Sequence, residues 1–405
     1  MPEAVIVAHT RSPIGRAMKG SLKEIRADDL LTQVIGSVLD DVPALDAAEI
    51  GDLILGCGLP GGEQGFNMAR RVAVHLGFDH LPGTTVTRYC SSSLQTTRMA
   101  FHAIKAGEGT AYLSAGVETV SSFPRGTSDH WPGTENPLFA SARDRTTSRS
   151  ASGEAWTDPR EIGLLPDVYI EMGETAENVA SLTGITRAEQ DEWAVRSQHR
   201  AEAATKRGHF ESEITPVTMP DGTVVSTDDC PRFGTTYEAV AGLKPVFRES
   251  GSVTAGNSCP LNDGAAALVV MSDVRARELG LTPLARIIST GVTGLSPEIM
   301  GLGPIEATKQ ALEHAGMSVG DIDLAEINEA FAVQVLGSAD ALKLDLDKLN
   351  VNGGAIALGH PFGMTGARIT GTLINNLQAE DKAIGLETMC VGGGQGMAML
   401  IERLA

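Results

Sequence analysis

The feature that most constrains the fold of this 405-residue chain is a similarity between its first third and its last third. At an offset of 272 residues, positions 50–54 align with 322–326, and positions 110–118 align with 382–390. The aligned segments contain the short apolar runs that are typical of buried strands. The same offset brings Cys90 to within two residues of His360. We therefore predict that the chain contains two copies of one folding unit.

Strands and helices are predicted to alternate within each of these units. In the first unit, the residue pattern predicts strands over 4–8, 52–55 and 110–115 and helices over 27–39 and 91–105. In the second unit, it predicts strands over 284–289, 324–327, 383–388 and 397–401 and helices over 304–314 and 365–377. Alternation of this kind indicates a layered α/β fold.

The middle of the chain departs from this pattern. Residues 121–163 are rich in Ser, Thr, Arg, Pro and Gly, which predicts an irregular segment that covers a functional region. Helices are predicted over 175–183 and 187–207, and Asp221-Gly222 predicts a hairpin turn. The apolar run 265–271 is expected to return to the first unit as its last strand. We therefore expect a first half formed by 1–120 with 262–282, an inserted loop domain over 121–261, and a second half over 283–405.

The net charge of −19 limits the partners that this chain can bind. Nucleic acids and anionic membranes require a basic surface, so neither is an expected partner. The aromatic content of 4% also argues against a protein that works by stacking bases. An anionic small molecule is not excluded, because a few Arg or Lys residues can reverse the field within one cleft.

Targeting signals and metal-binding patterns are not found in the sequence. The longest strongly apolar stretch, 264–271, is much shorter than the roughly 20 residues of a membrane-spanning helix. The first residues lack the basic region of a signal peptide, and the last four are no peroxisomal address. The five cysteines form no CxxC pair and no zinc spacing. We expect a cytoplasmic protein with reduced thiols, no metal and no cofactor, in which a cysteine in a special context is a candidate nucleophile.

The first such context is the segment around Cys90. A strand is predicted to end at Thr87-Arg88-Tyr89, and a helix is predicted to begin after Cys90. The unpaired N–H groups and the positive dipole end of a helix favour a thiolate. The alternative is a small buried cysteine beside a serine-rich helix cap.

The second context is a glycine-rich loop that carries His360 between Gly359 and Pro361. Glycine and proline define the turn and allow other backbone segments to approach the imidazole. Histidine is the usual general base near neutral pH. The alternative is a histidine that is hydrogen-bonded in a loop without a role in chemistry.

Two further segments follow predicted strands. Cys390 begins a run of glycines, 392–394, between two strands; this position and the lack of a lysine argue against a phosphate-binding loop. Asn328 follows the strand 324–327, at the kind of edge where open α/β sheets bind ligands. The alternatives are a tight turn with an incidental cysteine and an asparagine that caps a helix. A thiol nucleophile, an imidazole base, a second thiol and glycine-loop amides together form a set suited to acyl transfer.

At these residues the sequence resembles the thiolase family of acetyl-CoA C-acyltransferases. The resemblance extends over nearly the whole chain and includes motifs in the family's order. These are Arg11-Ser12-Pro13-Ile14-Gly15, the Cys90 segment, Met172-Gly173-Glu174-Thr175, Val253-Thr254-Ala255-Gly256-Asn257, Asn328-Glu329-Ala330-Phe331, 352–361 and 390–396. The resemblance implies two similar α/β halves in five layers, αβαβα, with a loop domain inserted in the first half. It also implies a homodimer or homotetramer.

The resemblance implies roles for individual residues. Cys90 would carry the acyl group as a thioester, His360 would accept the proton of its thiol, and Cys390 would exchange a proton with the α-carbon of the second acyl-CoA. Asn328 would hold a water beside His360 in one oxyanion site. Gly392 would supply a backbone N–H to the other, together with Cys90. Coenzyme A would be a substrate, with contacts expected from Arg232, Cys259, Met172 and Phe331.

Three positions depart from the common family pattern. Ser93 stands where many members have glycine, so a side chain there would crowd the helix start or add a hydroxyl beside the thioester. Cys259 replaces a serine that contacts coenzyme A, and Glu171 replaces a histidine before the Met172-Gly173 pair. These departures leave open a non-catalytic acyl-CoA or lipid-binding member. A condensing enzyme of the ketoacyl synthase type is a further alternative, but Asn328 and Cys390 argue against it. Chain length, branching and reaction direction stay open.

Overall fold

The computed structural model describes residues 2–126, 129 and 132–405. Apart from a small two-stranded sheet, its strands form one ten-stranded sheet with two similar halves, which we call the first and the second sheet. The strands of the first sheet are, in spatial order, β4 (Gly83–Val86), β3 (Leu53–Gly56), β5 (Ala111–Thr119), β8 (Asn262–Ser272) and β1 (Ala4–Arg11). Those of the second are β10 (Leu324–Ile327), β11 (Ile384–Val391), β12 (Gln395–Arg403) and β9 (Ala285–Gly294). A short bridge at Val5 and Ile6 joins β1 to β9, so the two sheets are hydrogen-bonded to each other.

The pairing of the strands confirms the predicted duplication. Both halves contain a parallel pair followed by two antiparallel pairs: β3–β5, β5–β8 and β8–β1 in the first, and β10–β11, β11–β12 and β12–β9 in the second. The first half has a further parallel pair, β4–β3, at its edge. The helix before β5 is α3 (Ser92–Ala106), and the helix before β11 is α12 (Thr365–Ala379). The expected return of the chain to the first sheet is also observed, because β8 lies between β5 and β1. The division into three domains stays a prediction.

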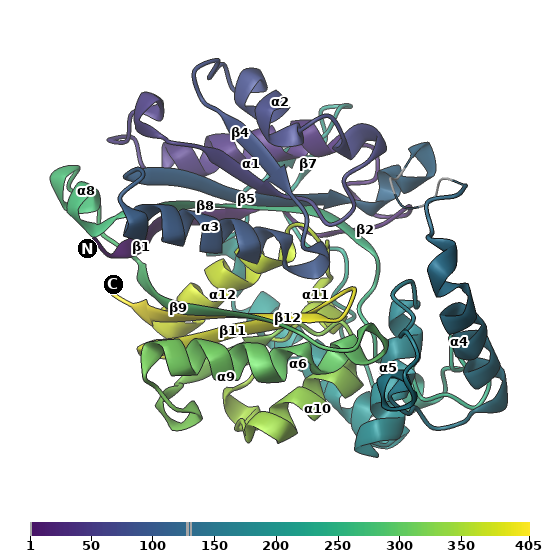
Figure 1. Ribbon diagram of the computed structural model, residues 1–405. Helices are drawn as coiled ribbons and strands as arrows, with labels where there is room; N and C mark the ends of the chain where they lie inside the picture. Colours follow the sequence, from purple (N-terminus) through teal and green to yellow (C-terminus); the bar gives the residue numbers. More distant parts are fainter. Residues whose placement is uncertain (1, 127–128, 130–131) are drawn as a thin grey trace.

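The helices and sheets form five layers (Figure 1). The outer face of the first sheet is covered by α1 (Ala27–Asp40) and α2 (Met68–His75), and that of the second by α9 (Gly303–Ala315) and α10 (Ala332–Leu342). Between the sheets lie α3 and α12. These two helices meet closely, because a side chain at Gly366 would lie 2.2 Å from the backbone nitrogen of Leu94. Close contact in the middle layer brings the segments that precede α3 and α12 together.

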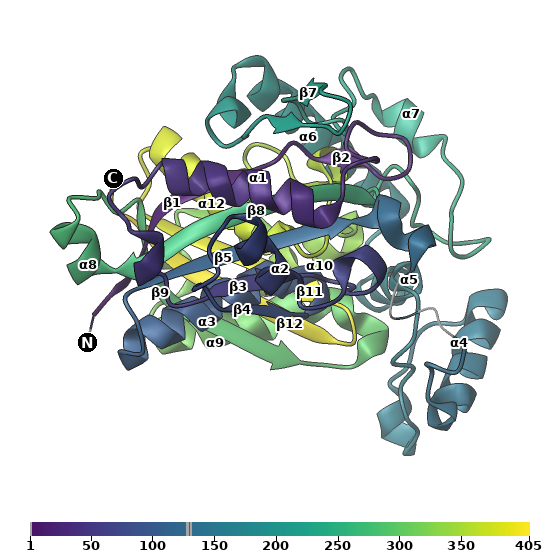
Figure 2. The ribbon, with the colours of Figure 1, turned by 90° about the horizontal axis from the view of Figure 1, so that it is seen from above.

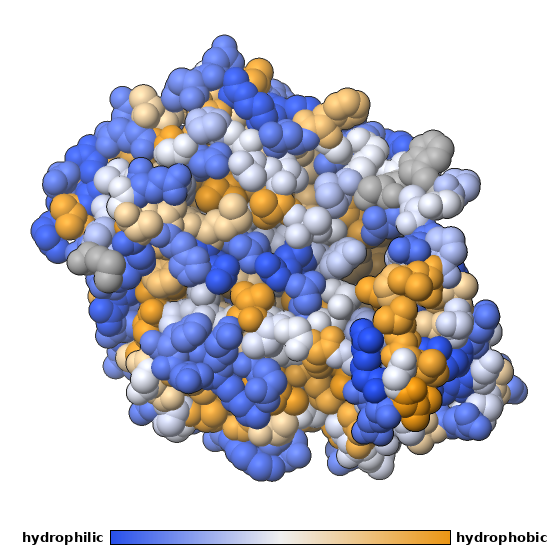
Figure 3. All heavy atoms as spheres, in the orientation of Figure 1, coloured by the Kyte–Doolittle hydropathy of each residue, from blue (hydrophilic) through white to orange (hydrophobic). Residues whose placement is uncertain are grey.

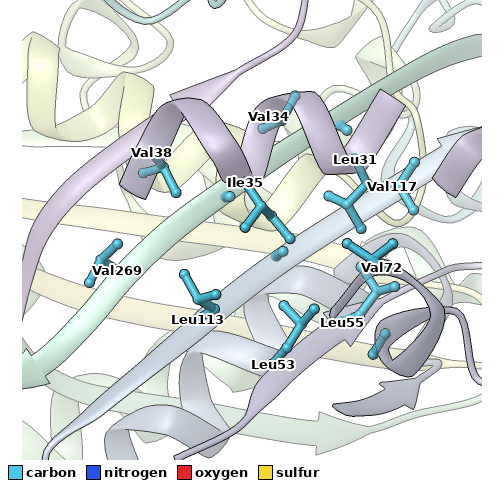
Figure 4. Packing of buried hydrophobic residues seen from close by; sticks show 14 of the residues in the cluster. Leu31, Val34, Ile35, Val38, Leu53, Leu55, Val72, Leu113, Val117 and Val269 are labelled. Atoms are coloured by element: carbon cyan, nitrogen blue, oxygen red, sulfur yellow. The ribbon is translucent and has the colours of Figure 1, made fainter. Parts of the chain in front are cut away.

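The apolar spacing of α1 explains how the outer layers pack. Its buried residues recur at helical spacing and face the first sheet, as Figure 4 shows for Leu31, Val34, Ile35 and Val38. Their partners include Leu55 and Val117 of the sheet. Burial of each such side chain contributes about 1.5–3 kcal/mol relative to exposure.

The middle of the chain contains more helix than expected. The hairpin is confirmed, with β6 (Val217–Thr218) and β7 (Val224–Val225) on either side of Gly222, whose φ is +86°. The expectation of an irregular segment over 121–163 is wrong for α4 (Ala140–Ser152), which projects at one side of the molecule (Figure 2). Only two residues of α4 are buried, so the sequence carries no apolar stripe to reveal it. The remaining elements are β2 (Gly15–Arg16), α5 (Met172–Thr183), α6 (Arg187–Lys206), α7 (Tyr237–Ala241), α8 (Asp273–Glu278) and α11 (Ala355–Leu358).

Candidate functional site

The four segments singled out in the sequence lie at corresponding ends of the two halves. Cys90 lies between β4 and α3, and His360 lies before α12. Asn328 follows β10, and Cys390 is the penultimate residue of the neighbouring strand β11. Because β10 and β11 are parallel, their carboxyl ends meet at one edge of the sheet, where the Asn328 N–H donates to Thr388 O at 3.0 Å. The topology therefore delivers all four residues to one region.

Side-chain contacts join these segments directly. The side-chain nitrogen of Asn328 lies 3.3 Å from Nε2 of His360. Arg88 donates to Oε1 of Gln395 at 2.6 Å, and Gln395 donates to Gly392 O at 3.3 Å. The Cys90 segment is thus tied to the turn that follows Cys390.

Cys90 occupies a strained and enclosed turn. Tyr89 has a φ of +44°, and the 3-10 turn Tyr89–Ser91 leads directly into α3. Cys90 is only 8% exposed, whereas Tyr89 is 41% exposed. A side chain with φ in the left-handed region costs free energy, and such strain is concentrated at functional sites. The turn therefore supports the interpretation of Cys90 as a reactive residue.

The protonation state of Cys90 differs from the expectation. Burial raises the pKa of its thiol to about 11, although the backbone N–H groups of Gly392 and of Cys90 itself oppose the rise. The expectation that the helix terminus would favour a thiolate is therefore wrong for the free protein. Desolvation of the charged sulfur outweighs the favourable dipoles.

His360 is buried and held in one tautomer. The hydroxyl of Thr365 donates to Pro361 O at 2.8 Å, so it is available as an acceptor for Nδ1–H of His360 at 2.6 Å. Nε2 is then left with a lone pair that accepts from Asn328. Burial, together with the positive charge of Arg368, lowers the pKa of His360 to about 3. His360 is therefore a neutral base in the free protein, and no hydrogen bond joins it to Cys90 among the described residues.

Cys390 completes the set as a second neutral thiol. It is fully buried, and burial raises its pKa well above the ordinary value, with further contributions from Cys90 and Cys259 nearby. It packs in one apolar cluster with Phe331 and Met172. A protonated thiol can give up a proton, which suits the role of a general acid.

Three of the four expected coenzyme A contacts gather beside Cys390. The sulfur of Met172 would lie 3.7 Å from a side chain placed at Gly392, and the Cys259 N–H donates to Ala330 O at 3.1 Å, next to Phe331. Arg232 is different, since it is exposed on the loop before α7 and its N–H donates to Gln198. Its guanidinium makes no ion pair among the described residues, so it is available to an anionic group.

The three departures from the family pattern have distinct outcomes. The hydroxyl of Ser93 accepts the N–H of Ala367 at 2.9 Å, so it faces the first turn of α12. It links the two central helices. Cys259 has its pKa raised by burial and by Cys90, which indicates that it lies close to the nucleophile. Glu171 is exposed just before α5.

Sequence reasoning missed the residues that support the imidazole. Asn262 accepts the backbone N–H of His360 at 2.9 Å, and Thr365 holds its Nδ1. Asn262 is distant in sequence and gives no local signal. Thr365 lies five residues after His360, at the predicted start of a helix, which was the only available hint.

A groove of about 1150 Å³ lies elsewhere on the molecule. Trp193, Leu302 and Leu336 are among its lining residues, and it shares none with the Cys90 region. Among the described residues, no group of His, Cys, Asp and Glu is arranged to hold a metal ion. No helix in this described part is long and apolar enough to cross a membrane.

The raised pKa of Cys90 predicts how the free protein reacts with iodoacetamide. Only the thiolate is alkylated, so a pKa of about 11 places most of the sulfur in the unreactive form at neutral pH. The rate of Cys90 alkylation is expected to rise about tenfold per pH unit from pH 7 to pH 10. Peptide mass mapping at each pH provides the measurement. A rate that is already constant at pH 7 would contradict the neutral thiol.

Comparisons with known proteins agree with this geometry. Profiles described as thiolase N-terminal domain and thiolase C-terminal domain match residues 4–274 and 281–403. The chain is 42% identical to an acetyl-CoA acetyltransferase of Escherichia coli (strain K12), with 100% of both chains covered. It is 42% identical to a 3-ketoacyl-CoA thiolase of Saccharophagus degradans, covering 99% of this chain and 98% of the relative.

Solved structures are equally similar. A crystal structure of the Bacillus anthracis acetyl-CoA acetyltransferase has a TM-score of 0.87 at 41% identity, covering 100% of this chain and 99% of that one. A human mitochondrial 3-ketoacyl-CoA thiolase in complex with CoA has a TM-score of 0.86 at 34% identity, covering 99% and 98%. The fold is the thiolase fold, and the chain belongs to the thiolase family of acyltransferases.

Proposed function

We propose that this thiolase cleaves and forms 3-ketoacyl-CoA reversibly, through an acyl group carried on Cys90. The observation that carries the proposal is the gathering of two protonated thiols and one neutral imidazole from three separate segments of the chain. Residues Cys90, His360 and Cys390 are the catalytic set, assisted by Asn328 and Gly392.

In the cleavage direction, the sulfur of Cys90 attacks the ketone carbon of 3-ketoacyl-CoA while its proton passes to Nε2 of His360. The bond between the two carbonyl-bearing parts breaks, and its electron pair leaves on the α-carbon of acetyl-CoA. Cys390 gives its proton to that carbon, which forms acetyl-CoA and a Cys390 thiolate. The acyl group stays on Cys90 as a thioester.

In the second half of the cycle, coenzyme A attacks the thioester and its thiol proton passes to the Cys390 thiolate. The acyl group leaves as acyl-CoA, and the Cys90 thiolate takes back the proton from His360. Because His360 and the two thiols start neutral, each can perform its first proton transfer without prior ionisation. The backbone N–H groups of Cys90 and Gly392 would stabilise one oxyanion. His360 and a water held by the buried, unpartnered Oδ1 of Asn328 would stabilise the other.

Binding of coenzyme A is proposed to use the loop region. Met172, Phe331 and Cys259 lie beside the reactive thiols, where they would contact the acyl end. Arg232 is exposed and would meet a phosphate. No further cofactor is part of the proposal, since the three reactive side chains account for each proton and bond.

The direct test is thiolysis of acetoacetyl-CoA, followed by the loss of the absorbance of its magnesium enolate. Brief exposure of the protein to the same substrate should add one acetyl group to Cys90, detected by peptide mass spectrometry. An active protein without an adduct on Cys90 would reject the mechanism, and an inactive protein that binds acyl-CoA would identify a non-catalytic member. A series of 3-ketoacyl-CoAs of increasing length and branching would then define the substrate.

We further propose that the protein is a homodimer or homotetramer. Several large apolar side chains are exposed, among them Phe66 at 90%, Ile162 at 73% and Leu138 at 64%. Figure 3 shows apolar residues gathered on the side of the molecule where α4 and α5 lie. A single-chain mass of 42.4 kDa in light scattering would contradict an oligomer.

The domain division and the compartment are proposed as well. The first half is formed by 1–120 with 262–282, the loop domain by 121–261 and the second half by 283–405; proteolysis that fails to cut first within 121–261 would argue against this division.

All five cysteines are free, which supports a reducing, cytoplasmic location. Recovery of the protein in a cell-envelope fraction would contradict it.

A further inference from the structure

Glu118 is a fully buried carboxylate that the mechanism above does not use. One of its oxygens accepts the backbone N–H of Gly58 at 2.6 Å and that of Gly363 at 2.9 Å. The other accepts from the backbone of Leu59 at 3.2 Å and from the side chain of Gln64 at 2.9 Å. Four N–H donors from three separate segments converge on this one side chain, and the thiol of Cys57 donates to its second oxygen at 3.7 Å.

The donor set is matched to the ionised form of Glu118. Gln64 uses its own oxygen to accept the backbone N–H of Thr119 at 2.7 Å, so its NH₂ group must face Glu118. Burial raises the pKa of this carboxyl, and the four N–H donors oppose that rise. A proton on Glu118 would find no acceptor among these partners, and an unpaired buried donor is costly. The arrangement is therefore built for a charged acceptor.

The hydrogen bonds of Glu118 lead to both reactive loops. Gly363 lies three residues after His360 in the same loop. On the other side, Gly58 O accepts the hydroxyl of Thr87 at 2.8 Å, and Thr87 in turn receives the backbone N–H of Tyr89 at 3.3 Å, next to Cys90. One carboxylate thus connects the loop of the base with the loop of the nucleophile.

Gly58 and Gly363 are packed so closely against β5 that neither position has room for a side chain. A side chain at Gly363 would lie 2.2 Å from Val117 O, and one at Gly58 would lie 2.7 Å from the Glu118 carboxylate. Both backbones are therefore pressed against β5 and its carboxylate.

The duplication gives Glu118 a counterpart. Glu118 is the penultimate residue of β5, and Cys390 is the penultimate residue of β11, at the offset of 272 residues that relates the halves. The second half uses this position for a reactive thiol. The first half uses it for a carboxylate that accepts from three backbone N–H groups and from the side chains of Gln64 and Cys57.

We propose that Glu118 is a positioning residue that holds the Cys90 loop and the His360 loop at the separation needed for proton transfer between them. This inference rests on the proposed function and adds a supporting residue to it. It requires that the loss of the Glu118 charge slow the acylation of Cys90 more than it weakens the binding of coenzyme A.

The test is Glu118→Gln, which keeps the shape but presents an NH₂ group to backbone donors. The rate of Cys90 acylation by acetoacetyl-CoA, measured by quenched-flow mass spectrometry, is expected to fall about 100-fold, as for a reacting pair displaced by about 1 Å. KM for coenzyme A is expected to stay within about twofold, because the substrate contacts are untouched. The pH range over which kcat is constant should also change, because His360 and Cys90 are no longer held at the distance that proton transfer between them requires.

Glu213→Gln is the matched control. Glu213 is also buried and accepts from Arg11 at 2.7 Å and from Thr372 at 3.1 Å, but it contacts the part of α12 remote from His360. Glu213→Gln should lower the midpoint of thermal unfolding with little change in the rate of Cys90 acylation. An acylation rate reduced equally in both variants, or a wild-type rate and pH profile in folded Glu118→Gln, would overturn the proposal.

Glu118→Asp keeps the charge and provides a second variant if Glu118→Gln does not fold. The shorter side chain cannot reach both loops, so an intermediate loss of acylation is expected. Wild-type acylation in Glu118→Asp would also overturn the proposal. Failure of the proposed function is distinguishable, because the wild-type protein would then form no acyl adduct on Cys90 at all.

Discussion

Replacement of Cys90 by serine is expected to lower the turnover of acetoacetyl-CoA thiolysis by a factor on the order of 10⁴ or more, as for other enzymes that lose their nucleophile. A thiol with a pKa of about 11 can still transfer its proton to His360 as the new bond forms. A hydroxyl in the same buried turn is a much weaker acid and is also a poorer leaving group from the acyl intermediate. The measurement is kcat in the magnesium-enolate assay, together with a search for the acetyl adduct on residue 90.

Ala73→Ser serves as the control for this loss. Ala73 is fully buried in α2 of the first half, so a serine there tests for the general effect of a buried hydroxyl on folding. Its turnover is expected to stay within about threefold, in line with ordinary substitutions outside a reacting group. Comparable thermal midpoints with a loss confined to Cys90→Ser would support the assignment. Retention of more than a tenth of the activity in Cys90→Ser would contradict it.

Replacement of Cys390 by serine is expected to separate the two halves of the reaction. Cys90 and His360 are unchanged, and the thiolate of coenzyme A can leave without a proton from Cys390, so the acyl adduct should still form from acetyl-CoA. Proton exchange at the α-carbon requires the second thiol, and loss of a general acid or base typically costs about 10²- to 10⁴-fold. Exchange of the methyl protons of acetyl-CoA with deuterated solvent, followed by NMR, should therefore fall by that factor while adduct formation persists.

The adduct is the internal control in this experiment, because it reports that Cys390→Ser is folded and binds acetyl-CoA. Exchange at the wild-type rate would remove Cys390 from the mechanism. Loss of the adduct together with exchange would mean that Cys390 supports the Cys90 turn and does not act as a separate acid. The first outcome differs from the expected result only in the exchange rate, and the second differs only in the adduct.

The elements that surround the site were predicted well where burial follows a local pattern. The predicted strand 324–327 coincides with β10, and the predicted helix 365–377 differs from α12 only at its end. Nearly every residue of both is buried, and their apolar residues follow the period of the element, as Ile369, Leu373 and Leu377 do in α12. The opposite holds for α4, which is largely exposed and escaped prediction. Apolar periodicity reveals a helix only when the helix has a buried face.

The amino-acid sequence by itself determined which side chains carry reactive groups and that the chain repeats one α/β unit. Only the tertiary structure decided their protonation, since burial sets the pKa values of Cys90 and His360 in directions that the helix terminus alone does not indicate. It alone also revealed Glu118, whose partners come from loops separated by about 300 residues of chain. The physical reason is that local apolar spacing encodes strands and helices, whereas desolvation and converging hydrogen bonds arise only when distant segments pack together.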